Sequence, residues 1–380
     1  MKKLIATGVS ALALTAAAFA AQAEPVKVGM ITTLSGGGSS LGIDVRDGFE
    51  LAIKNAGNSE VEVIVVDDAQ KPELAVQAAD KLIQQDKVDI MTGIIWSNLA
   101  MAVVPSTVAQ NVFYISPNAG PSALAGQGCN KDYFNVAYQN DNFHEAMGAY
   151  ANEAGYKKTF ILAPNYPAGQ DSLTGFKRFY KGELAGEIYT KLGQDDYAAE
   201  IAQIRASGAD SVFFFLPGGM GIAFTKQYAG SGVGIPLMGP AFSFSQDILP
   251  AIGDAALGVK NSASWSHDLD NEANKTFVST FKEAYGRLPS VYAAQAYDTA
   301  NLIMAAAAKA SVKDANAFRA ALKEADFASV RGKFKFGNNN HPIQDIYVRE
   351  VVMEDGTITN KIVGTAFTDH QDAYAADCKM

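Results

Sequence analysis

Residues 90–122 read IMTGIIWSNLAMAVVPSTVAQNVFYISPNAGPS, and this stretch decides the fold because strand-like and helix-like runs alternate within it. The apolar run Ile90–Ile95 predicts a buried strand, Leu99–Val108 predicts a helix, and Val112–Ile115 predicts a second buried strand. Buried strands that alternate with helices are typical of a parallel sheet flanked by helices. The chain is therefore expected to be an α/β protein.

A polar loop follows each of the two predicted strands of this stretch. The first, Trp96-Ser97-Asn98, precedes the helix, so Ser97 or Asn98 can cap it while nearby backbone N–H groups stay free for a ligand carboxylate. The second loop, Ser116–Ser122, combines Pro, Asn and Gly, which allow the backbone to approach a guest closely. These residues alone leave two interpretations open, an anion pocket and two ordinary capped helix starts.

The same alternation extends on both sides of this stretch, and it restarts beyond Tyr138 as a second series of similar composition. Two such series predict two similar lobes, each a parallel-dominated sheet flanked by helices. The other expected strands are Val26–Ile31, Val61–Val66, Thr159–Ala163, Gly186–Lys191, Ser211–Leu216 and Pro236–Met238. The other expected helices are Asp44–Asn55, Glu73–Gln85, Phe143–Ala154, Ser172–Lys181, Ala198–Ser207 and Gly221–Ser231.

The last third of the chain must pack on the lobes already formed. Residues 273–310 are mostly helical in pattern, whereas Val330–Phe336 and Ile346–Met353 are strand-like. Because no linker rich in Ser, Pro or Gly separates the two series, the economical arrangement returns the chain to the first lobe for its helices and then crosses back. This predicts three hinge crossings, with lobe 1 formed by residues 24–138 plus 268–347 and lobe 2 by residues 139–267 plus 348–380.

The first 23 residues have the pattern of a secretory signal peptide. Lys2 and Lys3 precede the apolar run Leu4–Ala21, which ends at the small-x-small site Ala21-Gln22-Ala23. The alternative, a retained membrane anchor, fits less well with an Ala-rich run that ends in a cleavage pattern. The mature chain is therefore expected to begin at Glu24 and to be a soluble protein of a bacterial periplasm.

The charge balance argues against nucleic acid and anionic membranes as partners. The chain has 31 Lys and Arg residues against 40 Asp and Glu, a net charge of −9, and loss of Lys2 and Lys3 with the signal takes it to −11. An acidic protein is repelled by phosphate backbones and by anionic lipid surfaces. About 357 residues remain after cleavage, enough for two domains of ordinary size. We expect a monomer that binds no nucleic acid.

Residue patterns for metal, nucleophilic or nucleotide chemistry are missing from the sequence. The four histidines have no HExxH or paired spacing, and no GxSxG, GxxxxGK[ST] or GxGxxG motif stands in the right context. We therefore expect no metal, no cofactor and no enzyme activity. Cys129 and Cys378 are the only cysteines, and in an oxidising compartment we expect one long-range disulfide, with two buried free thiols as the alternative.

Six loops at the carboxyl ends of the predicted strands are poor in charge and mix aromatic residues with Ser, Asn and Gly. Ligands of open α/β sheets bind at these strand ends. Trp96, Tyr166, Phe242 and Phe244 suit a flat apolar guest with one polar end, although core packing is the alternative for each ring alone. The loops are residues 35–41, 96–98, 116–120, 166–171, 217–220 and 241–244.

Short motifs run through the whole mature chain in a fixed order: Val28-Gly29, Leu34-Ser35-Gly36, Leu41-Gly42, the Ser97 loop, Ile115-Ser116-Pro117, Met238-Gly239-Pro240, Gly253-Asp254-Ala255-Ala256 and Tyr297-Asp298. Their order and spacing resemble the branched-chain amino-acid type of periplasmic solute-binding protein, the type I binding proteins of ABC importers. Trp96-Ser97-Asn98, residues 118–122 and residues 165–169 look like the aromatic-acid branch of that family. The resemblance implies two lobes that close on a ligand and present the closed form to a membrane permease.

The resemblance also implies a ligand site between the lobes. In relatives that bind amino acids, the serine at the place of Ser97 and the small residues after the Ser-Pro pair bind the α-carboxylate. Other contacts of the family fall on loops that meet an interlobe cleft. The positions expected to bind the ligand here are Leu41, Trp96, Ser97, Asn98, Asn118, Ala119, Gly120, Tyr166, Gly218, Gly219, Ala241, Phe242 and Tyr292.

Two departures from the amino-acid binders predict a ligand without an amine. Where those relatives usually carry Thr or Ser and then Glu, this chain has Gly120 and Ala241. A buried ammonium without a partner is costly, so we expect a small carboxylate that lacks an α-amino group, and the aromatic lining favours benzoate or phenylpropenoid acids. The alternative is a branched-chain or other aliphatic amino acid or amide, with Asp171 or Asp247 pairing the ammonium. A sensory domain is the alternative from another class of protein.

Overall fold

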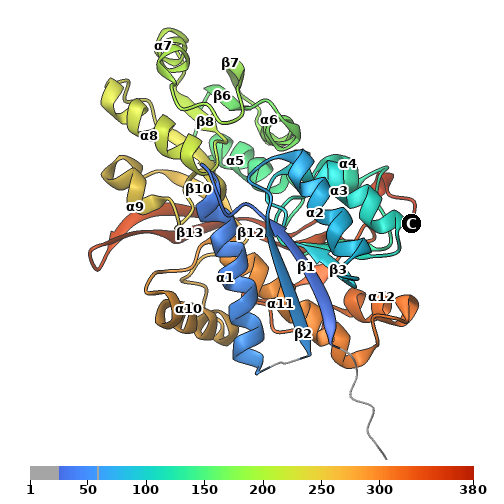
Figure 1. The fold of residues 1–380 in the computed structure, drawn as a ribbon. Helices are drawn as coiled ribbons and strands as arrows, with labels where there is room; N and C mark the ends of the chain where they lie inside the picture. The colour runs from blue at the N-terminus through green and yellow to red at the C-terminus, as the bar shows by residue number, and fades with distance from the viewer. Residues whose placement is uncertain (1–24, 58–59) are drawn as a thin grey trace, which may run out of the picture.

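The computed structural model describes residues 25–57 and 60–380, which fold into two sheets covered by helices (Figure 1). The predicted signal peptide, residues 1–23, lies outside the described residues. Along the described chain, no helix combines the length and the apolar character needed to cross a membrane. The two sheets confirm the predicted α/β class with two similar halves.

The first sheet has five strands, all parallel, in the order β2-β1-β3-β4-β5. Strands β3 and β4 are buried at every position, as expected for parallel strands covered by helices on both faces. The strands are β1 (Val26–Thr32), β2 (Val61–Asp67), β3 (Ile90–Thr92), β4 (Phe113–Ser116) and β5 (Tyr133–Asn135).

Helices from both ends of the chain cover this first sheet. Helix α1 packs along α11, and Gly48 permits the close approach because a Cβ there would lie 2.2 Å from the carbonyl oxygen of Ala293. The chain therefore returns to the first sheet for its late helices. The helices of this half are α1 (Ser39–Ala56), α2 (Pro72–Gln84), α3 (Ser97–Ala109), α4 (Ser122–Ala125), α10 (Glu272–Tyr285), α11 (Val291–Lys309) and α12 (Ala315–Glu324).

The second sheet has eight strands in the order β11-β12-β10-β9-β8-β6-β7, with β13 paired to β12. Strands β6 (Lys158–Pro164), β7 (Glu183–Thr190), β8 (Ser211–Phe214), β9 (Leu237–Pro240) and β10 (Lys260–Ala263) run parallel. Strands β11 (Lys335–Phe336), β12 (Pro342–Glu354) and β13 (Thr357–His370) add the antiparallel part. The helices are α5 (Asn142–Glu153), α6 (Pro167–Phe179), α7 (Ala198–Ala206), α8 (Gly219–Ser231) and α9 (Leu249–Ile252), with the short 3₁₀ turns η1 (Ala241–Ser243), η2 (Gly253–Ala256) and η3 (Ala375–Asp377).

The largest departure from the predicted elements lies at residues 330–336, of which only Lys335–Phe336 form a strand. The preceding residues bind the buried carboxylate of Asp298 instead: the Val330 backbone N–H donates to Asp298 at 3.0 Å, and Arg331 Nε lies 3.0 Å from its Oδ2. The backbone N–H of Val330 is used in this way and that of Arg331 donates to the Ser329 hydroxyl at 3.1 Å, so neither is available to a strand ladder. Three strands and three helices of the structure were not predicted from the sequence: β5, β10, β13, α4, α9 and α12.

Two connections between the halves, at residue 137 and at residues 331–344, contact each other beside this buried ion pair. The Arg331 Nη1 and the Gln344 Nε2 both donate to the carbonyl oxygen of Ala137, at 3.2 and 2.8 Å. Arg331 and Asp298 are both buried, so each compensates the charge of the other. The lobe boundaries predicted after residues 138, 267 and 347 stay a prediction, and the last of them falls inside β12.

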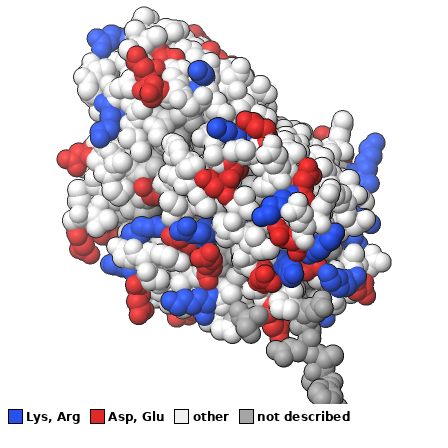
Figure 2. Space-filling model, in the orientation of Figure 1, with Lys and Arg blue, Asp and Glu red and all other residues white. Residues whose placement is uncertain are grey.

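Acidic and basic side chains are mixed over the face of the molecule shown in Figure 2. Both signs occur over the lower half of this face, and neither forms one continuous patch there. This face therefore offers no single-sign surface of the kind that binds a nucleic acid backbone.

A disulfide between Cys129 and Cys378 confirms the predicted pairing, with Cα atoms 5.7 Å apart. It joins the segment after α4 to the residues that follow β13, across 249 residues of sequence. The chain end is thereby tied to the first half of the molecule although it leaves the second sheet.

Removing this disulfide should lower the free energy of unfolding. A long closed loop restricts the unfolded chain, and for a separation of 249 residues the chain-entropy relation gives about 5 kcal/mol as an upper value. The Cys129→Ser, Cys378→Ser double variant should therefore unfold at a clearly lower denaturant concentration than the oxidised protein. Reduced wild-type protein is the control and should behave like the variant; equal midpoints for oxidised protein and variant would contradict the prediction.

Candidate functional site

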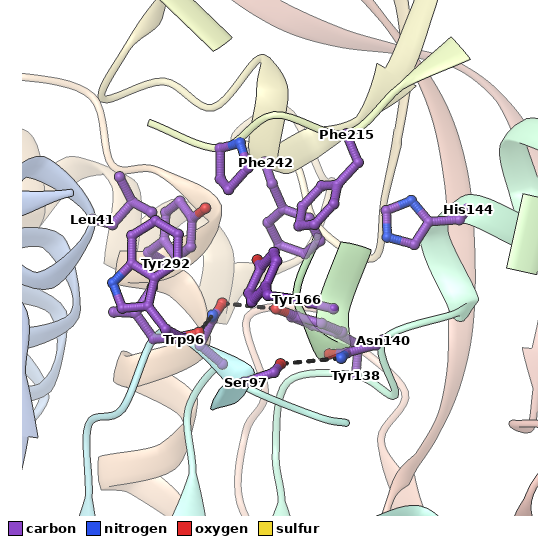
Figure 3. A pocket seen from close by; sticks show the side chains of 14 residues that line it. Leu41, Trp96, Ser97, Tyr138, Asn140, His144, Tyr166, Phe215, Phe242 and Tyr292 are labelled. Carbon is purple, nitrogen blue, oxygen red and sulfur yellow. Dashed lines mark hydrogen bonds between the residues drawn. The ribbon is translucent and has the colours of Figure 1, made fainter. Parts of the chain in front are cut away.

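A pocket lies between the two halves of the molecule (Figure 3). Its cavity volume is about 20 Å³, room for about one water molecule, so the lining residues nearly close the pocket. Helices α3, α6 and α11 present their first turns to it through Ser97, Ala168 and Tyr292. The lining residues are Leu41, Ile95, Trp96, Ser97, Asn118, Tyr138, Asn140, His144, Tyr166, Ala168, Phe215, Pro217, Phe242 and Tyr292.

Ser97 is the first residue of α3, and no side chain caps this helix. The prediction that Ser97 or Asn98 caps it is therefore wrong, and the backbone of Trp96 occupies the N-cap position. The Ser97 Oγ accepts a hydrogen bond from Asn140 Nδ2 at 3.1 Å, while its own hydroxyl hydrogen has no acceptor among the described residues. This hydroxyl and the first N–H groups of α3 are thus available to an anion.

The loop after β4 is held largely by its own polar groups. The Gly120 backbone N–H donates to Asn140 Oδ1 at 3.1 Å, and the Asn118 side chain donates to a carbonyl oxygen of the neighbouring strand end at 2.8 Å. The carbonyl oxygen of Ala119 accepts hydrogen bonds from three side chains, those of Ser116, Tyr133 and Asn135. Of the three loop positions predicted to meet a ligand carboxylate, only Asn118 lines the pocket.

Aromatic rings form most of the remaining lining. Trp96 lies 6.2 Å from Tyr166, centroid to centroid, and Tyr166 stacks on Phe215 at 6.2 Å with an interplanar angle of 16°. The ring centroids of Phe242 and Tyr292 are 5.9 Å apart. These rings give the pocket flat apolar walls, which suit a flat apolar guest.

The hydroxyl groups of Tyr166 and Tyr292 have no hydrogen-bond partner among the described residues. Burial raises the pKa of both phenols above the usual range, so both stay neutral. A neutral phenol can donate one hydrogen bond and accept another. Both residues can therefore bind polar atoms of a guest.

The described residues that line the pocket carry no charge. Among them only His144 is a base, and burial lowers its pKa to about 3, which keeps the imidazole neutral. The nearby carboxylate of Asp171 is occupied, because it accepts hydrogen bonds from the Ser122 hydroxyl at 2.6 Å and from Asn140 Nδ2 at 2.9 Å. The lining thus offers no acid to a ligand ammonium group.

The pocket brings together about half of the residues predicted to bind a ligand. Leu41, Trp96, Ser97, Asn118, Tyr166, Phe242 and Tyr292 line it. The predicted residues that do not line it are Asn98, Ala119, Gly120, Gly218, Gly219 and Ala241. Gly219 has another role, since its N–H donates to the carbonyl oxygen of Gly37 at 3.2 Å and so joins the two halves.

The lining residues that the sequence analysis did not select are Ile95, Tyr138, Asn140, His144, Ala168, Phe215 and Pro217. Ala168 and Pro217 lie inside the strand-end loops already considered, and Ile95 and Phe215 lie one or two residues before such loops. Tyr138, Asn140 and His144 come from the connection after β5 and from the start of α5. No strand-end pattern marks that segment, and the polar run of residues 139–142 is the only signal in the sequence.

Proteins similar to this chain are bacterial solute-binding proteins. The Leu/Ile/Val-binding protein homolog 6 of Brucella melitensis biotype 1 is 30% identical over 385 positions, which cover 96% of this chain and 97% of the relative. The solute-binding protein of an ABC transporter from R. palustris, solved with benzoate, has a TM-score of 0.89 and 32% identity over 94% of this chain and 100% of its own. A second, from Rhodopseudomonas palustris BisB5 with 3,4-dihydroxybenzoic acid, has a TM-score of 0.85 and 29% identity over 92% and 99%.

The family assignment rests on matches along almost the entire described chain. The family model for periplasmic binding proteins matches residues 25–357. Fold and family are those of solute-binding proteins, which bind a small molecule and deliver it to permease components, and the family implies a periplasmic location. The chain therefore belongs to the periplasmic binding protein family, as a solute-binding protein of an ABC transporter.

Proposed function

We propose that this protein captures a small carboxylate without an α-amino group, an aromatic acid of the benzoate or phenylpropenoid type, and delivers it to an ABC importer. The observation that carries the proposal is the character of the pocket: flat aromatic walls, free anion-binding donors at the start of α3, and no acidic side chain in the lining. Similar solved proteins were obtained with benzoate and with 3,4-dihydroxybenzoic acid, which supports this ligand class.

The carboxylate is expected to bind at Ser97. The Ser97 hydroxyl can turn its hydrogen toward a ligand oxygen without losing the hydrogen bond that it accepts from Asn140. The first turn of α3 adds unpaired N–H groups and the positive end of the helix dipole. These donors compensate the desolvation of one negative charge, although the lining contains no basic group that is protonated at neutral pH.

An α-amino group would find no equivalent partner. Asp171 is already bound by Ser122 and Asn140, and Asp247 accepts a hydrogen bond from the Ser40 hydroxyl at 2.8 Å and does not line the pocket. Moving either carboxylate into the pocket would break contacts that join the two halves of the molecule, although Asp247 Oδ1 itself has no hydrogen-bond partner among the described residues. An amino-acid ligand is the second candidate, favoured by the Leu/Ile/Val-binding name of the Brucella relative.

Contacts around the pocket join the two halves, which is the arrangement expected of a closed binding protein. The Gly219 N–H reaches Gly37 at 3.2 Å, Ser40 reaches Asp247 at 2.8 Å, and Ser122 reaches Asp171. Each pair takes one partner from either half. We infer that ligand capture is coupled to the formation of these contacts.

A thermal-shift panel tests the ligand class. Benzoate, hydroxybenzoates and cinnamates at concentrations well above Kd should raise the melting temperature by mass action, whereas leucine, isoleucine, valine and short 2-oxo acids should raise it little or not at all. The protein without ligand is the reference, and an aromatic amine of similar size controls for unspecific binding of rings. Stabilisation by leucine but not by benzoate would replace this proposal with the amino-acid alternative.

Replacement of Ser97 tests the carboxylate end of the pocket. The Ser97→Ala variant should bind its aromatic acid with about 1–3 kcal/mol less free energy, because a charge-assisted hydrogen bond is lost. Calorimetric titration measures the change. Ser106→Ala is a matched control on the exposed part of the same helix and should leave the affinity unchanged. Equal affinities for Ser97→Ala and the wild type would remove Ser97 from the site.

The pH dependence of stability tests the interlobe carboxyl groups. Burial and the neighbouring Asp247 raise the pKa of Asp44, even though Arg287 and Ser290 act in the opposite direction. Because the folded state then holds this proton more tightly than the unfolded state, Asp44 costs stability as the pH rises. The Asp44→Asn variant should therefore gain in melting temperature relative to the wild type as the pH rises from about 4 to about 7.

Arg287 keeps an ionic partner in this variant, since it also contacts Asp47 at 2.8 Å. Asp314→Asn, at the exposed start of α12, is the matched control for the loss of one carboxylate. Parallel melting curves for Asp44→Asn and wild type across the pH range would contradict the assigned direction.

A further inference from the structure

His144 is a buried polar side chain of the pocket that the proposed carboxylate site does not use. It lies in the first turn of α5, is 1% exposed, and its ring points into the pocket beside Phe215 (Figure 3). Its Nδ1 is sealed from solvent and has no hydrogen-bond partner, and no partner of the other ring nitrogen is present among the described residues.

The surroundings of His144 are aromatic. Its ring lies edge-on to Phe215 at 5.1 Å and to Phe213 at 5.8 Å, and 6.4 Å from Phe242. Ser97, by contrast, contacts the side-chain amide of Asn140. The polar groups of the pocket thus form two sets, one at the start of α3 and one within the aromatic walls.

The hydrogen-bonding state of the imidazole follows from its burial. The ring is neutral, so one nitrogen carries a hydrogen and the other accepts. A buried N–H without an acceptor is rarer than a buried acceptor without a donor, so the fitting tautomer leaves the sealed Nδ1 without hydrogen. The Nε2–H then faces the pocket and requires an oxygen acceptor on the ligand.

We propose that His144 selects aromatic acids that carry an oxygen substituent on the ring, a hydroxyl or a small ether, by donating an Nε2–H hydrogen bond to that oxygen. This inference rests on the proposed function and narrows its ligand class. A ligand whose carboxylate lies at Ser97 and whose ring lies between the aromatic walls brings its far substituents toward the second polar set. A ligand with an unsubstituted ring leaves the His144 N–H without an acceptor. This loss lowers its binding affinity relative to that of an acid with an oxygen substituent on the ring.

The Tyr166 and Tyr292 hydroxyls are the competing partners for such a substituent. A phenol can turn its O–H about the C–O bond, whereas the packing of Phe213 and Phe215 against the His144 ring fixes the direction of the Nε2–H. A phenol can therefore turn to another acceptor when the ligand offers none, so these hydroxyls discriminate less between substituted and unsubstituted rings. This difference favours His144 as the specificity-determining residue.

Calorimetric titration of the full-length protein with paired ligands tests the inference. The panel is benzoate, 3- and 4-hydroxybenzoate, 4-methoxybenzoate, and 3- and 4-methylbenzoate, in which methyl matches the size of hydroxyl without accepting a hydrogen bond. Wild type should bind at least one oxygenated acid about tenfold or more tightly than its methyl counterpart. His144→Phe should abolish this ratio and still bind benzoate, and His144→Gln, which retains a side-chain donor, should recover part of it.

The outcomes separate the possible explanations. An unchanged hydroxyl-to-methyl ratio in His144→Phe, or its loss in Tyr166→Phe or Tyr292→Phe alone, would overturn the role of His144. If a folded His144→Phe variant binds benzoate and the hydroxybenzoates with equally reduced affinity, His144 contacts the carboxylate rather than the ring substituent. This result would also overturn the proposed role of His144. Tight binding of benzoate without any preference for oxygenated rings overturns this inference but leaves the proposed function, whereas absence of binding by every aromatic acid overturns both.

Discussion

The polar end of the pocket depends on one side chain, the carboxamide of Asn140. Its Nδ2 donates to Ser97 Oγ at 3.1 Å and to Asp171 at 2.9 Å, and its Oδ1 accepts the N–H of Gly120 at 3.1 Å. Its own backbone N–H donates to the carbonyl oxygen of Gly120 at 2.8 Å. One buried amide therefore fixes the first residue of α3, the loop after β4 and an acid of α6 at the same time.

This arrangement determines which charge the pocket can accept. Because Asn140 supplies a donor to Ser97, the serine must use its own hydrogen elsewhere, and it can direct this hydrogen into the pocket that it lines. The same amide also donates to Asp171 Oδ2, so that carboxylate oxygen is already hydrogen-bonded within the protein. The hydrogen bonds of Asn140 leave donors free toward the pocket and occupy an acidic acceptor. The pocket is therefore expected to bind an anion more tightly than a cation, although none of its described lining residues is charged.

How much of this could be predicted depends on where each residue lies in the chain. The βα alternation up to β4 was predictable because its strands are mostly apolar, and Trp96, Ser97 and Tyr166 followed because they stand a few residues after such strands. Strand β13 was missed because most of its residues are partly or fully exposed, so no apolar run marks it. Asn140 and His144 were missed for another reason: they precede or begin α5, and only the three-dimensional course of the hinge brings them to the strand ends.

In the loop after β4, Gly120 lies so close to Tyr138 that the two positions cannot change independently. A Cβ at Gly120 would lie 2.1 Å from the carbonyl oxygen of Tyr138, so the Thr or Ser of amino-acid binders cannot be accommodated with this backbone. Tyr138 cannot shift alone, because its hydroxyl donates to Asn118 at 3.0 Å and its ring packs 4.9 Å from Phe242. A side chain at position 120 would thus displace the hinge segment and with it the aromatic wall. Gly120 and Tyr138 are therefore coupled, because a side chain at position 120 would move the backbone that carries one ring of the pocket lining.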